Sequence, residues 1–220
     1  MNYYIVVEGA VEKKVYTKWI PLLNPSLSPI NTLIETAENN FIIFDGGGYP
    51  SILEMIDNAI EDIINLGNIF TLVVVIDSEE MTRQDKFEEI ETYIKKDRPN
   101  LNINYKIIVQ HFCFEAWALG NRRIVSSNPS NPELIRFLTH HHVRMHDPEE
   151  LTPISIEYGN RAQFSETYLR RLIQEKHHQT YTKRSPDFVF HKTYLEQLIK
   201  RLNETNHINS FSELIETFKA

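Results

Sequence analysis

The pattern of apolar and polar positions predicts buried strands that alternate with amphipathic helices over the first half of the chain. Four short apolar runs lack polar alternation, which is typical of strands buried on both faces of a sheet. They cover residues 5–7, 41–44, 71–76 and 105–109. Apolar residues recur at helical spacing after the first three runs, over 11–20, 52–64 and 87–94. Strands alternating with helices favour an α/β fold with a parallel sheet flanked by helices.

The second half of the chain has a different pattern. From Asn121 onward no strand is predicted, and helical spacing covers 131–138, 161–177, 191–203 and 210–219. A polar, histidine-rich loop runs from the first of these helices to about Pro153. We therefore expect an α/β core in residues 1–120 and a mostly helical C-terminal portion, residues 121–220, packed on that core.

Composition narrows the class of protein. The chain has 41% hydrophobic and 24% charged residues, which is normal for a soluble globular protein. The single cysteine, Cys113, excludes an internal disulfide. No apolar run reaches membrane-spanning length, and the opening run is too short and too acidic for a signal peptide. We expect a cytoplasmic protein that does not contact membranes.

The formal net charge of −7 is unevenly distributed. Residues 1–150 hold 13 Lys and Arg against 22 Asp and Glu, a balance of −9, whereas residues 151–220 hold 10 against 8, a balance of +2. Five basic residues and two histidines lie between Arg170 and Arg184, with one acid, Glu175. This asymmetry indicates a cation site in one half and an anion-binding surface in the other.

Acidic residues follow each predicted strand: Glu8, Asp45, Asp77 with Glu79, and, a few residues after the fourth strand, Glu115. The carboxyl ends of parallel strands meet at one edge of a sheet, so these carboxylates are expected to converge. Their mutual repulsion favours a divalent cation, and oxygen ligands suit Mg²⁺ or Mn²⁺. Helix capping is the simpler explanation for Asp77 and Glu79, and the helix dipole for Glu12.

Several of these residues together resemble the Toprim fold of topoisomerases, primases and certain nucleases. The resemblance rests on a strand ending in Glu8-Gly9 and a later hydrophobic strand ending in Asp77-Ser78-Glu79. A second glutamate four residues after the first, Glu12, is similar to the nuclease branch of overcoming-lysogenization-defect proteins. Small stand-alone relatives associated with anti-phage systems also carry a Phe-Glu-x-Trp segment and a late Tyr-x-Lys, here Phe114-Glu115-Ala116-Trp117 and Tyr181-Thr182-Lys183.

The resemblance implies a nuclease that needs Mg²⁺ or Mn²⁺ and hydrolyses phosphodiester bonds in DNA or RNA. Its catalytic residues would be Glu8, Asp77 and Lys183, and its metal ligands Glu8, Glu12, Asp77, Glu79 and Glu115. The basic residues Arg170, Arg171, Lys176 and Arg184 would bind the nucleic-acid backbone. Relatives often act beside an ATPase partner, which implies a role in bacterial anti-phage defence. Many relatives have Asp where this chain has Glu79, and the longer side chain alters the expected metal geometry.

Other interpretations stay open at this point. A catalytically degenerate Toprim module would bind a partner protein or a nucleotide without cleavage. Lys183, in a Thr-Lys-Arg-Ser-Pro loop, is equally compatible with a solvated surface lysine. The sequence does not decide between DNA and RNA, or between a monomer and a homo-oligomer.

Two further motifs have simpler explanations than binding sites. Gly46-Gly47-Gly48 lacks the Lys-Ser/Thr of a phosphate-binding P-loop, so we expect a turn. His140, His141, His142 and His146 have no cysteine nearby and point in different directions, so we expect a polar surface loop and not a zinc site.

Overall fold

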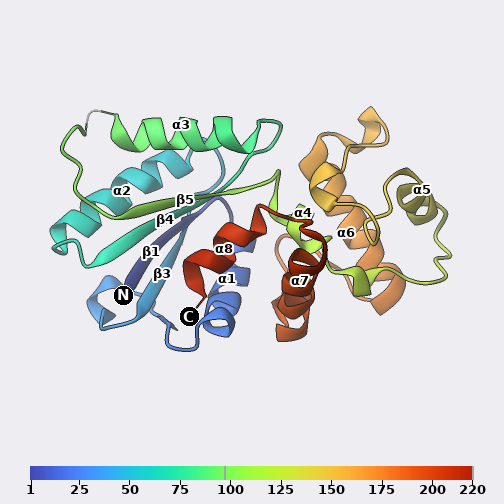
Figure 1. Cartoon of the computed structure of the whole chain (residues 1–220), viewed down its shortest axis with the longest axis horizontal. Coiled ribbons are helices and arrows are strands. Elements are labelled where there is room, and N and C mark those ends of the chain that lie inside the picture. Colours follow the sequence, from blue (N-terminus) through green and yellow to red (C-terminus); the bar gives the residue numbers. More distant parts are fainter. Residues whose placement is uncertain (97, 220) are drawn as a thin grey trace. The chain divides into compact units, whose positions relative to one another are not determined.

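The computed structural model describes residues 1–96 and 98–219. The chain divides into two compact units (Figure 1). Unit 1 comprises Met1–Ile76, Thr82–Val109 and Glu213–Ala220, and unit 2 comprises Asp77–Met81 and Gln110–Ser212. Both units are therefore built from separate segments of the chain, and each is described by itself.

A five-stranded parallel sheet organises unit 1, as the alternation of strands and helices predicts. The strands are β1 (Asn2–Val7), β2 (Ser28–Pro29), β3 (Asn40–Asp45), β4 (Phe70–Asp77) and β5 (Tyr105–Gln110), in the spatial order β2-β3-β1-β4-β5. β1 lies at the centre, where Val7 is in register with Asp45 on one side and Val75 on the other. The sheet is apolar on both faces because helices cover both.

The helices of unit 1 are α1 (Ala10–Leu23), α2 (Ile52–Asn65), α3 (Arg83–Lys95) and most of α8 (Phe211–Phe218). In Figure 1, α2 and α3 lie on one side of the sheet and α1 and α8 on the other. The first side holds a continuous apolar core in which Ile56 and Ile60 of α2 and Ile90 of α3 pack against Val6 and Val74. Full burial of each such side chain contributes about 1.5–3 kcal/mol of transfer free energy.

Helices dominate unit 2, which contains α4 (Phe114–Ala118), α5 (Pro132–His140), α6 (Arg161–His177) and α7 (Lys192–Thr205). Short 3₁₀ turns connect them, among them η2 (Arg122–Ile124) and η3 (Pro148–Glu150). α6 is central, since Phe164, Tyr168 and Leu172 on its buried face are fully inaccessible and it packs against α4 and α5. Its first turn carries a capping box, in which Asn160 and Gln163 satisfy each other's backbone N–H groups.

The predicted strands and long helices are all present, with boundaries that differ by a few residues. The prediction did not include β2, which has two residues, or α4, which has five. No helix in the described part of the chain combines the length and the apolar character that a membrane span requires.

Candidate functional site

Glu8 directly follows β1 in unit 1 and is held there by the glycine turn after β3. The Gly46 N–H donates to the Val7 carbonyl and the Gly48 N–H to the Glu8 carbonyl, each at 2.8 Å. The Gly47 N–H donates to the Asp45 carboxylate at 2.9 Å. All three amides of the turn therefore have acceptors within the protein, which supports the prediction of a turn and not a phosphate-binding loop.

Glu12 folds back over the first turn of α1. Its side chain is only 6% exposed, and a Cβ atom added to Gly9 would lie 3.1 Å from its Oε2. Gly9 has an extended backbone, with φ −142° and ψ 174°, so its dihedral angles do not require glycine. Glycine is favoured here because the missing side chain leaves room for the Glu12 carboxylate, which also suits the positive end of the helix dipole.

In unit 2, the charges of Asp77, Glu115 and Lys183 act on one fully buried group, the Cys113 thiol. Burial is the main reason that the pKa of Cys113 lies well above its ordinary value, and the carboxylates of Glu115 and Asp77 raise it further. The Lys183 ammonium opposes them. Three predicted site residues, from the end of β4, from α4 and from the late Tyr-x-Lys segment, therefore lie near enough to Cys113 to act on its charge.

Glu115 is the most buried acid of this group, with 1% of its surface exposed. The Tyr181 hydroxyl donates a hydrogen bond to its Oε1 at 2.9 Å. Burial raises the pKa of Glu115, while the Lys183 charge and the Tyr181 hydrogen bond lower it, and burial prevails. The Tyr-x-Lys segment thus acts on Glu115 through both of its named residues.

Gln110, at the end of β5, belongs to the same site and was not predicted. The Ser78 N–H donates to the Gln110 carbonyl at 2.9 Å. In a pair of parallel strands, this hydrogen bond places Asp77 directly opposite Gln110, so both side chains lie on the same face of the sheet. Gln110 is fully buried, and its amide nitrogen and oxygen have no hydrogen-bond partner among the described residues. The sequence offers only one signal for it: Gln110 is two residues after Ile108 on β5, so its polar side chain lies on the same face of the sheet as the apolar Ile108.

Glu79 lies in the tight turn after β4. It is exposed, its backbone is left-handed with φ +50°, and its N–H donates to the Phe112 carbonyl at 3.0 Å. The preceding Ser78 is buried, and its hydroxyl lies 3.1 Å from His111 Nδ1. The turn is therefore pinned to the segment after β5, and it carries the Glu79 carboxylate outward.

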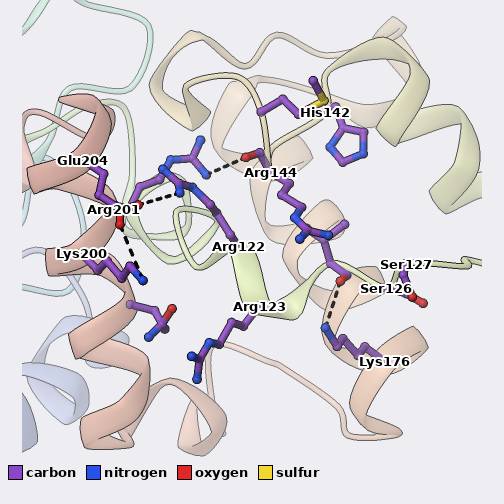
Figure 2. A pocket seen from close by; sticks show the side chains of 13 residues that line it. Arg122, Arg123, Ser126, Ser127, His142, Arg144, Lys176, Lys200, Arg201 and Glu204 are labelled. Carbon is purple, nitrogen blue, oxygen red and sulfur yellow. Dashed lines mark hydrogen bonds and ion pairs between the residues drawn. The ribbon is translucent and has the colours of Figure 1, made fainter.

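The predicted nucleic-acid-binding residues have several different environments in unit 2. Arg170 pairs with Glu166 at 3.5 Å, and Arg171 pairs with Glu133 on α5. Arg184 is exposed beside Lys183. Lys176, near the end of α6, donates to the Val125 carbonyl at 3.0 Å. Unlike Arg170, Arg171 and Arg184, it lines the pocket shown in Figure 2.

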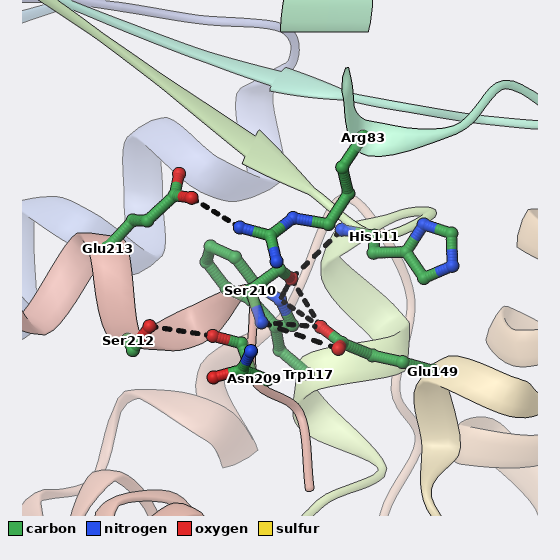
Figure 3. A network of polar contacts seen from close by, with 8 residues as sticks. All are labelled: Arg83, His111, Trp117, Glu149, Asn209, Ser210, Ser212 and Glu213. Carbon is green, nitrogen blue, oxygen red and sulfur yellow. Dashed lines mark hydrogen bonds and ion pairs between the residues drawn. The ribbon is translucent and has the colours of Figure 1, made fainter. Parts of the chain in front are cut away.

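Trp117 anchors α4 through a buried polar network (Figure 3). It is fully buried, as predicted, and its Nε1–H lies 2.6 Å from Ser210 Oγ and 3.2 Å from Glu149 Oε1. The Ser210 hydroxyl receives the His111 N–H at 3.0 Å, and the Trp117 ring packs on Phe211 with centroids 5.1 Å apart. This network fixes α4, and with it the position of Glu115.

The carboxylates of unit 2 suit a hard divalent cation in chemistry and charge. Burial is the main reason that the pKa of Cys113 is raised, and the charges of Glu115 and Asp77 add to it. Among the described residues, no three His, Cys, Asp or Glu side chains form a ready-made metal-binding group. Mg²⁺ is commonly held by one or two carboxylates together with water and substrate phosphates, and Asp77 and Glu115 each offer a carboxylate of that kind.

Comparison of the chain with protein-family models, with curated proteins and with solved structures finds no match. The resemblance to Toprim nucleases consequently rests on the residues of the chain itself, and membership of that family stays a prediction.

Proposed function

We propose that the protein is a Mg²⁺- or Mn²⁺-dependent phosphodiesterase that cleaves nucleic acid. The observation that carries the proposal is the grouping of Asp77, Glu115 and Lys183 around Cys113 in unit 2. Two carboxylates and one ammonium, drawn from three distant segments, act on the same buried thiol. Such a set of charges serves phosphoryl chemistry, in which an anionic phosphate must meet both a cation and a nucleophilic water.

Each of the predicted site residues has a distinct role in this proposal. Asp77 and Glu115 would hold the cation, with Glu79 as a further ligand at the rim, and Glu8 and Glu12 are the ligands predicted in unit 1. A bound divalent cation supplies charge stabilisation and a water of lowered pKa. Lys183 would stabilise the charge that develops on the phosphate oxygens in the transition state. Tyr181 keeps the Glu115 carboxylate in a fixed orientation through its hydrogen bond.

Asp77→Ala tests this proposal most directly. Binding of Mn²⁺ is measured by calorimetry, and cleavage is measured on panels of single- and double-stranded DNA and RNA with and without Mn²⁺. We expect the wild-type protein to bind Mn²⁺ and to cleave, and Asp77→Ala to lose both while its circular dichroism stays unchanged. Asp187→Ala, which removes an exposed acid elsewhere in unit 2, is the matched control and should behave like the wild type.

The same experiment separates catalysis from the alternative of a degenerate binding module. Such a module would bind Mn²⁺ weakly or not at all and would cleave none of the substrates. Cleavage at the wild-type rate by Asp77→Ala would show that the site lies elsewhere. A role in anti-phage defence beside an ATPase partner follows only from the resemblance, and co-purification with an ATPase would support it.

A further inference from the structure

Six of the thirteen residues that line a pocket of about 700 Å³ on unit 2 are arginines or lysines (Figure 2). They come from η2, from the histidine-rich loop, from the end of α6 and from α7. The basic residues are Arg122, Arg123, Arg144, Lys176, Lys200 and Arg201, and Glu204 is the only acid among the lining residues. This concentration of positive charge occurs in a chain whose formal net charge is −7.

The single carboxylate does not balance these charges. Glu204 is shared between Arg122, at 2.9 Å, and Lys200, at 3.6 Å. Among the described residues, Arg123, Arg144 and Lys176 form no salt bridge with any carboxylate. Like charges that converge in a partly enclosed space repel one another, and a bound anion would relieve that repulsion.

Buried contacts hold the wall of the pocket in place. Arg201 is only 1% exposed, and its guanidinium donates to the carbonyls of Val143 and His146 at 2.9 and 2.8 Å. It thereby fixes the loop from which Arg144 projects. Burial lowers the pKa of Arg201 to about 10, and the neighbouring charge of Arg122 contributes to that shift. Arg201 therefore gives the pocket a fixed wall, around which the more exposed cations are arranged.

His142 adds a polar group to the same wall. Its Nδ1 atom is buried and has no hydrogen-bond partner among the described residues. A buried ring nitrogen normally has a partner, so a ligand in the pocket is a natural one.

We propose that this pocket binds a small molecule that carries two or more phosphate groups, such as a nucleoside polyphosphate. Arginine forks match phosphate oxygens in pairs, and several cations from four segments can surround a chain of phosphates. The volume lies within the usual range for small-ligand pockets. A nucleic-acid backbone, in contrast, is bound along an extended basic surface. The site is separate from the carboxylate group of the proposed function and does not depend on it.

The test measures binding without metal and without nucleic acid, so that it is independent of cleavage. Calorimetry in EDTA compares ATP, pyrophosphate and a 5′-hydroxyl oligonucleotide as ligands for the wild type and for Arg123→Glu and Arg144→Glu. Both arginines are exposed, so these variants should fold normally, which circular dichroism checks. Arg136→Glu, on the exposed face of α5 and outside the pocket, introduces the same charge change as a control.

We expect ATP or pyrophosphate to bind with one-to-one stoichiometry, and each pocket variant to weaken binding at least about tenfold, as loss of a charged hydrogen bond does. The control should bind like the wild type. Absence of saturable binding by ATP and pyrophosphate would overturn the proposal. So would equal weakening by Arg136→Glu, or a preference of the pocket for the oligonucleotide over both phosphate compounds.

Discussion

At the residue scale, Glu115 experiences opposing influences that make its ionisation depend on the fold. Burial raises its pKa, whereas Lys183 and Tyr181 lower it without cancelling the effect of burial. In the unfolded chain the carboxyl ionises near its ordinary value of 4.5. As the pH rises above that value, the unfolded state therefore loses the proton before the folded state does, and the free energy of unfolding falls.

Glu115→Gln should remove this cost, because the amide cannot ionise. We expect a higher unfolding midpoint than that of the wild type at pH 7, and a difference that disappears near pH 4. Thermal unfolding across this pH range provides the measurement, with the exposed Glu157→Gln as the control. A gain in stability together with a loss of Mn²⁺-dependent cleavage would be the usual relation between stability and function at an active site. A variant less stable than the wild type at pH 7 contradicts the assignment.

Lys183→Met should separate catalysis from binding. Removal of one transition-state donor typically lowers the rate by about 10²–10³-fold, and affinity for the nucleic acid should change little. Single-turnover cleavage gives the rate, and a binding assay in Ca²⁺ gives the affinity. Lys192→Met removes an exposed lysine of the same unit and should leave both unchanged. Equal loss of affinity and rate would assign Lys183 to ground-state binding instead.

At the scale of elements, α4 shows how tertiary contacts stabilise a helix of five residues, which is too short to have a periodic apolar face. All five of its residues are buried, and the Trp117 ring links it to Ser210, Glu149 and Phe211. These partners lie far from it in the sequence. The helix therefore depends on tertiary contacts more than on intrinsic propensity.

Trp117→Ala should cost about 3–5 kcal/mol of unfolding free energy, as truncation of other buried aromatic residues does. Trp117→Phe keeps most of the ring but not the N–H donor, so it should cost less. Chemical denaturation with circular dichroism measures both variants. A cost below about 1 kcal/mol for the alanine variant would mean that the site around Trp117 is not tightly packed.

The elements that the sequence predicts are those with a long periodic pattern. α6 was predicted over its full length, and β4 was recognisable because the five consecutive apolar residues Leu72–Ile76 leave no polar face. α4 and β2 are too short to show a period. Gln110 was missed because a lone polar residue at a strand end resembles the start of a loop. The basic pocket was missed because its cations come from segments up to about eighty residues apart.

At the scale of the whole molecule, the uneven charge governs how a polyanion would be bound. The acidic N-terminal segments repel phosphate at long range, so binding depends on the basic residues of unit 2. Arg170 and Arg171 already pair with Glu166 and Glu133 at partly exposed positions. Such pairs contribute little to stability, so a phosphate can replace the carboxylate partner.

The double variant Arg170→Gln/Arg171→Gln should therefore bind nucleic acid more weakly and with a shallower dependence on salt. Each lost phosphate contact lowers the slope of log affinity against log salt by about 0.7–0.9. Titrations at several salt concentrations measure this slope. An unchanged slope would place the nucleic acid on another surface.

The division of the chain into units also bears on how the protein is made. The chain passes between the units after Ile76, Met81, Val109 and Ser212, so unit 1 is completed by its most C-terminal segment. There the Tyr3 hydroxyl donates to the Thr217 carbonyl at 3.2 Å, and the rings of Tyr3 and Phe218 pack 5.1 Å apart. The partners of Tyr3 are translated more than two hundred residues after it. α1 can cover part of this face early in translation, but the part that α8 covers, around Tyr3, stays exposed until the end, and chaperones bind exposed apolar surface of this kind.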